Sequence, residues 1–156
     1  MEALSLVMQV GLVDEDFKPV IAQTRERQMT ALVGITNTTL HRITLSNETT
    51  HSQTIKGMFV FTDLSVRQEG HYYLQFDLFE IRNGEIFHRA ESFSTQFRVY
   101  SPKTFPGMKP STPFTHQLKK VGTRVRVSKS IRTAKSSKSS TNQVDLVTEF
   151  EVETGL

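Results

Sequence analysis

The chain of 156 residues contains no cysteine and no tryptophan. The absence of cysteine excludes disulfide bonds, thiolate zinc sites and a cysteine nucleophile, and it fits a reducing compartment. The apolar residues 3–13 lack the positive flank and the small-residue cleavage site of a signal peptide. No other stretch approaches the roughly 20 apolar residues that a membrane helix needs. We therefore expect no cysteine chemistry and no membrane partner.

Motifs for catalysis and cofactor binding are also absent. The sequence has no glycine-rich phosphate-binding loop, no metal-binding helix motif and no nucleophile elbow. The five histidines are scattered without the pair spacing of metal ligands. The sequence therefore predicts a protein that is not an enzyme and that has no cofactor and no metal.

Helical periodicity is scarce, whereas strand patterns are frequent. Apolar side chains occupy every second position in Tyr72–Leu78 and again in Phe93–Val99, which is typical of a strand with one buried face. The alternation in Leu4–Leu12 and the short apolar run Met58–Phe61 predict two more strands. Asn83-Gly84 separates two apolar stretches, and both residues tolerate a positive φ, so a type I′ hairpin is predicted there.

The eleven phenylalanines are mostly part of this strand pattern. Core packing is therefore favoured over stacking on nucleobases, and Phe76 and Phe97 are expected to be buried. Many short strands separated by glycine and proline predict an all-β fold, a β-sandwich with one short helix.

The short helix is predicted at Pro113–Val121. Thr112 can cap its start, Pro113 suits the first helical position, and Gly122 suits the position after its end. Four prolines between residues 102 and 113 predict an ordered but irregular loop before it. A stiff basic loop loses little freedom on binding, which favours a recognition role.

Charge is distributed unevenly along the chain. Residues 1–100 carry nine Lys or Arg and twelve Asp or Glu, whereas residues 144–156 carry four acidic and no basic residues. Residues 101–143, here called the basic segment, carry ten basic and no acidic residues. Such a block of like charge either stays solvated or meets an anionic partner.

The basic segment contains a candidate nucleic-acid surface at Gly122–Lys129. Valines alternate there with Arg124 and Arg126, which predicts a strand with both arginines on its open face. Their guanidinium groups would lie about 6–7 Å apart, near the spacing of phosphates along a nucleic-acid strand. The alternative is pairing with an acid on a neighbouring strand, such as Asp77. The candidate phosphate-facing residues are Lys103, Lys109, Lys119, Lys120, Arg124, Arg126 and Lys129.

The C-terminal residues are expected to form a disordered tail, residues 132–156, after a domain at 1–131. Arg132–Asn142 is rich in serine, lysine and threonine. Alternation resumes at Val144–Glu153. That stretch is open to three interpretations: an edge strand, a segment that masks the basic region, or solvated tail.

Two stretches resemble signatures of the velvet family. The first is Phe59–Arg67 with Glu69–Glu80, and the second is Phe97–Gly107 followed by Ser111-Thr112-Pro113. Gly122 with Arg124–Val127 is similar to the closing basic strand of the family, and Leu32–Gly34 with Leu40–Arg42 is similar to a weaker, earlier block. The resemblance extends over roughly residues 5–130.

The resemblance implies a fungal regulator of development, sporulation and secondary metabolism, located in the nucleus and shuttling with the cytoplasm. It implies an immunoglobulin-like β-sandwich similar to the Rel homology region, which binds DNA through loops. The implied partners are DNA, other velvet proteins in homodimers or heterodimers, and a LaeA-type methyltransferase. The alternative is a dimerisation subunit without DNA affinity of its own.

The sequence departs from the family pattern in two places. The family domain usually opens with a further basic segment that contains cysteine and proline, and this chain is expected to start at or after that point. The DNA contacts of that segment therefore cannot be transferred. A divergent member, a partial gene model and a subunit that relies on its partner all fit this start. Thr62 also stands where the family usually has proline.

Overall fold

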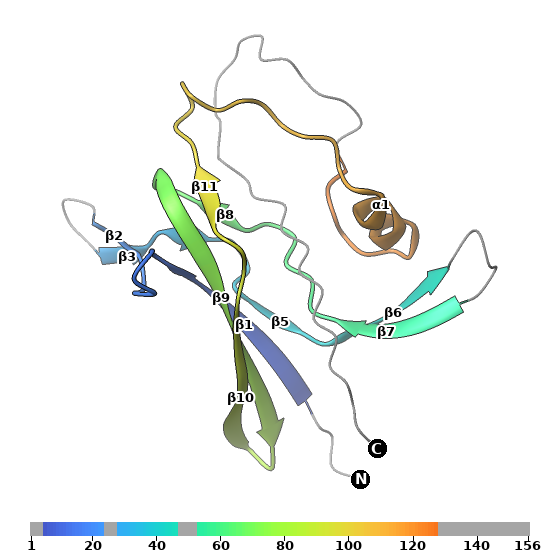
Figure 1. Ribbon diagram of the computed structural model, residues 1–156. Helices are drawn as coiled ribbons and strands as arrows, with labels where there is room; N and C mark the ends of the chain where they lie inside the picture. Colours follow the sequence, from blue (N-terminus) through green and yellow to red (C-terminus); the bar gives the residue numbers. More distant parts are fainter. Residues whose placement is uncertain (1–4, 24–27, 47–52, 128–156) are drawn as a thin grey trace.

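The computed structural model describes residues 5–23, 28–46 and 53–127. Its largest element, here called the main sheet, is antiparallel with the order β10-β9-β1-β5 (Figure 1). These strands are β1 (Ser5–Val13), β5 (Asn37–Thr39), β9 (Gly70–Arg82) and β10 (Glu85–Phe93). A fifth strand, β11 (Phe97–Val99), pairs with the start of β9.

Three two-stranded sheets accompany the main sheet. They pair β2 (Ile21–Gln23) with β3 (Gln28–Thr30), β4 (Leu32–Val33) with β8 (Ser65–Val66), and β6 (His41–Ser46) with β7 (Gln53–Met58). In the described ranges the single helix is α1 (Pro113–Lys120), which is too short to cross a membrane. The expected all-β fold with one short helix is confirmed.

The core lies between two layers of the chain. One layer is the inner face of the main sheet, with Met8, Val10, Leu12, Tyr72, Leu74 and Phe76. The other layer comes from Ala31 before β4, from β4 and β8, and from the stretch between β7 and β8, with Leu32, Phe59, Phe61, Leu64 and Val66. Phe76 is only 2% exposed, as expected. The prediction for Phe97 was wrong, because this side chain is only partly buried and packs against the core from β11.

The turn between β9 and β10 has the expected geometry. Asn83 has φ 55° and Gly84 has φ 77°, and Arg82 pairs with Glu85 across the turn. Two positive φ values in a two-residue connection match the type I′ hairpin. The hairpin prediction is therefore confirmed.

Two strand predictions were wrong in their bounds. Phe93–Val99 is not one strand, because residues 94–96 leave the ladder. Ser94 replaces the ladder there: its amide donates to the Leu74 carbonyl, and its Oγ accepts from the Leu74 amide, both at 2.9 Å. The run at Met58–Phe61 fails as a strand because β7 ends at Met58. The apolar residues that follow fill the space between the layers without strand pairing.

Candidate nucleic-acid interface

Helix α1 ends with two lysines and is followed closely by Arg124 and Arg126. The Thr112 Oγ1 accepts a hydrogen bond from the Thr115 amide at 3.2 Å, and Pro113 occupies the first turn. Gly122 follows the helix with φ 91° and donates to the Lys119 carbonyl at 3.1 Å. The predicted cap, first residue and terminating glycine are thus confirmed, and the helix ends one residue earlier than expected. Lys119 and Lys120 lie in its last turn, where cations are favoured by the helix dipole.

A second, smaller hydrophobic cluster fixes this helix to the β6–β7 hairpin. Leu118 is fully buried and packs with Ile43 of β6 and Met58 of β7. Leu45, Val60, Phe114 and Val125 surround this cluster. Figure 1 shows α1 lying over the hairpin, beside the main sheet. The end of α1 and the residues after it are therefore held on a packed support.

The strand predicted at Gly122–Lys129 was wrong for residues 122–127, which pair with no neighbouring strand. The Thr123 amide donates back to the Leu118 carbonyl at 3.0 Å, and the Val125 amide to the Thr123 carbonyl at 2.8 Å. Exposure still alternates as expected: Arg124 and Arg126 are exposed, whereas the valines between and after them are half-buried. Val125 is half-buried because it contacts the second hydrophobic cluster, and not because it pairs in a strand.

Asp77, the example given for the alternative pairing, is in contact with a histidine of the main sheet. The Asp77 Oδ1 lies 2.9 Å from the His88 Nε2 on β10. Lys103 and Lys109 are exposed on the loop that runs from β11 to α1, and Lys119 and Lys120 are exposed at the helix end. Lys129, the tail 132–156 and its Val144–Glu153 stretch lie outside the described residues.

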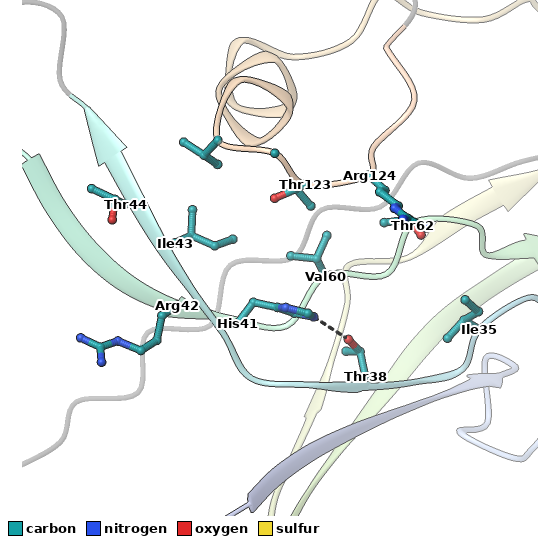
Figure 2. A pocket seen from close by; sticks show the side chains of 12 residues that line it. Ile35, Thr38, His41, Arg42, Ile43, Thr44, Val60, Thr62, Thr123 and Arg124 are labelled. Atoms are coloured by element: carbon teal, nitrogen blue, oxygen red, sulfur yellow. Dashed lines mark hydrogen bonds between the residues drawn. The ribbon is translucent and has the colours of Figure 1, made fainter.

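A groove of about 590 Å³ lies beside α1, between the start of β6 and the residues after the helix. Its polar lining comes from three separate parts of the chain: Thr38, His41, Arg42, Thr44, Thr62, Thr123 and Arg124. Figure 2 shows Thr123 and Arg124 on one side of the groove, with Val60 and Thr62 near them. His41 and Thr38 lie on the opposite side, and the His41 Nε2 is 3.4 Å from the Thr38 Oγ1.

The groove is electropositive in its composition. None of its lining residues is acidic. Within the described residues Arg124 has no ion-pair partner, whereas the Arg42 guanidinium points away from Thr62, Thr123 and Arg124 (Figure 2) and adds no charge to that side. Asp63 follows Thr62 in sequence, but its Oδ1 accepts the Ile35 amide hydrogen at 2.8 Å. The groove therefore offers hydrogen-bond donors and positive charge without a carboxylate among them.

Sequence reasoning had proposed only one residue of this groove, Arg124. His41 and Thr62 were noted for their place in family-like blocks and not as binding residues. No pattern of spacing connects positions 41, 62 and 124, because they meet only through packing of α1 on the β6–β7 hairpin. The structure does not bring Lys103 or Lys109 into the lining.

Comparison with known proteins identifies the family. The family model for the velvet factor matches residues 13–132. A probable velvet family sexual development regulator from Schizophyllum commune is 38% identical over 107 residues, which cover 65% of this chain and 36% of that protein. The spore development regulator vosA from Penicillium rubens is 38% identical, covering 67% of this chain and 25% of the relative.

A third relative, from Chaetomium globosum, is named as one of the subunits of the velvet complex. It is 37% identical over 72% of this chain and 26% of its own length. The chain thus spans about a quarter to a third of the length of these relatives. Because the family model matches well over half of its residues, the chain belongs to the velvet family.

Proposed function

We propose that this protein is a DNA-binding transcription regulator of development, sporulation and secondary metabolism that acts in the nucleus. Relatives are named as spore development regulators and as developmental and secondary metabolism regulators. Those names describe regulatory proteins and not enzymes.

One observation carries the DNA-binding part of this proposal. The described part of the basic segment presents six exposed cations and no acid, and four of them end or follow a helix that is anchored by a buried leucine. The six are Lys103, Lys109, Lys119, Lys120, Arg124 and Arg126. Lys129 extends the same run in sequence. Exposed cations that are held on a packed support suit a polyanion, because binding releases counterions and orders few side chains.

The binding would be directed mainly at the phosphate backbone. Contacts to phosphates position a protein on DNA, whereas contacts to base edges provide sequence specificity. Affinity should therefore fall steeply as salt rises, with a slope set by the number of phosphates that are neutralised.

The test is the salt dependence of duplex binding by the double variant Arg124→Gln with Arg126→Gln. Removing two phosphate-facing charges should flatten the log–log slope by roughly 2 units, with little change in sequence preference. The matched control is Arg82→Gln with Arg89→Gln, which removes two exposed charges at the far hairpin of the main sheet. Equal affinities and slopes for the parent and the Arg124/Arg126 variant, alone and with a velvet partner, would exclude these arginines from the interface.

A second candidate function is that of a velvet dimerisation module that contacts DNA only through its partner. The Chaetomium globosum relative is named as part of a velvet complex, which supports assembly. Several large apolar side chains on the main sheet and its adjoining turn are also exposed, including Phe17 at 53% and Ile86 at 68%. Contact with a LaeA-type methyltransferase belongs to the same proposal. Sedimentation of the chain alone and mixed with a velvet protein, followed by DNA binding of each sample, separates the two candidates.

A further inference from the structure

The groove beside α1 combines features that suit a small anionic group. Arg124 provides a guanidinium with several N–H donors, and Thr62 and Thr123 provide hydroxyl groups on the same side (Figure 2). His41 lies across the groove from them. Guanidinium groups bind phosphate oxygens in a two-pronged geometry that is stronger than a neutral hydrogen bond.

The size and the apolar part of the lining limit what this group can be. The volume of about 590 Å³ is within the range of small-molecule sites. That is more than a lone phosphate needs, so an attached sugar also fits. Val60 and Ile43 line the groove between its polar groups. A charged hydrogen bond beside apolar side chains is less weakened by water than one on an open surface.

We propose that this groove is a binding site for one phosphate ester, held by Arg124, Thr62, Thr123 and His41. When DNA supplies the ester, the proposal rests on the function proposed above and extends it to residues outside the basic segment. A free mononucleotide is the other source of the same chemistry. The site depends on the fold, since β6, the loop after β7 and the residues after α1 each contribute to it.

The groove contains its own control residue. Arg42 also belongs to the lining, but Figure 2 shows its guanidinium directed away from Thr62, Thr123 and Arg124. Arg42 and Arg124 are both exposed, and neither has an ion-pair partner in the described ranges. Arg42→Gln and Arg124→Gln therefore remove the same charge from the same region, and only the second removes a proposed ligand-binding group.

The first measurement is an NMR titration of the full chain. Inorganic phosphate, thymidine monophosphate and a short DNA duplex are added separately, and the backbone amide shifts of Thr62, Gly122 and Thr123 are followed. The site predicts that these amides shift with phosphate and with the mononucleotide, and also with the duplex when DNA supplies the ester. The mononucleotide should bind more tightly than phosphate because its sugar adds contacts in the groove.

The second measurement is the DNA and mononucleotide affinity of three variants. Arg124→Gln should weaken binding roughly tenfold or more, as expected for loss of a charged hydrogen bond. Thr62→Val keeps the side-chain shape and should weaken binding about threefold. Arg42→Gln should weaken mononucleotide binding by less than about twofold, because its charge does not face the ligand.

The outcomes separate this site from the proposed function. If the parent binds DNA but Arg124→Gln and Arg42→Gln behave alike and the groove amides do not shift, the phosphate site is overturned and DNA binding stands. If the parent binds no DNA but the mononucleotide shifts these amides and Arg124→Gln abolishes the shifts, the site stands with a free nucleotide as ligand. If none of the probes shifts them, the site is rejected whatever the DNA result.

Discussion

The main sheet and the α1 region differ in the partners available to their charged side chains. In the main sheet, polar and charged side chains of β9 and β10 contact each other across the strands: Arg89 contacts Glu80, His88 contacts Asp77, and Gln75 donates to Glu91. The described basic segment contains no acid of its own, so its cations cannot pair with an acid within the segment. Cross-strand pairs contribute to sheet stability, whereas a run of cations without acids is unfavourable unless an anion binds.

The two regions also differ in how much core supports them. Thirteen buried residues form the main cluster, whereas three buried residues hold α1 to the β6–β7 hairpin within the described ranges. A small cluster opens at lower free energy than a large one. We therefore infer that the main sheet determines global stability and that the α1 region is a separately adjustable binding surface. Four substitutions test this division.

The largest effect is expected from Phe76→Ala in the main cluster. Phe76 is 2% exposed, and its ring centroid lies 6.0 Å from that of Phe61 in the opposite layer. Truncation should lower the free energy of unfolding by about 3–5 kcal/mol, as expected for a buried aromatic side chain. Urea denaturation followed by circular dichroism measures this loss. A loss below about 1 kcal/mol would contradict the two-layer core.

Leu118→Ala tests the smaller cluster. Leu118 is fully buried between α1 and the hairpin. We expect a loss of about 2–3 kcal/mol, toward the lower end for buried leucines because a small cluster relaxes around the cavity. Hydrogen exchange should accelerate in α1 and much less in β9, and DNA affinity should fall although no charge is lost. Equal acceleration in β9 would show that the two regions unfold as one unit.

Thr112→Ala tests the start of α1 without changing its packed face. The substitution removes the oxygen that accepts from the Thr115 amide, and loss of an N-cap costs about 1 kcal/mol. Thr112→Ser is the matched control, because serine retains the hydroxyl group. The prediction is contradicted if the serine and alanine variants are equally stable in thermal and urea unfolding.

The sequence was informative where a local pattern had a local cause. The alternation along β9, the Asn83-Gly84 turn and the cap at Thr112 each depend on a few neighbouring residues, and all three are present in the structure. The predicted bounds of two strands were wrong where tertiary contacts took the place of strand pairing. Ser94 interrupts a strand by bonding Leu74, and Phe59 is buried without being in a strand.

The candidate site was predicted only in part for the same reason. Composition alone identified the cations, because a stretch with ten basic and no acidic residues can be recognised without knowing the fold. It could not show that Arg124 lies near Thr62 and across a groove from His41. Nor could it show that residues 123–125 turn back toward α1, because the alternation of Arg and Val fits a strand equally well.

The smallest effect is expected from Arg89→Gln on the main sheet. Arg89 contacts Glu80 on the neighbouring strand and also lies over the Phe87 ring at 5.2 Å, but its side chain is 46% exposed. Exposed pairs of this kind are worth about 0.2–1 kcal/mol, so urea unfolding should change by no more than that. Affinity for DNA should stay within about twofold of the parent, because this charge already has a protein partner. If Arg89→Gln weakened DNA binding as strongly as Arg124→Gln, then net charge and not the α1 region would control binding, and the division between the two regions would be wrong.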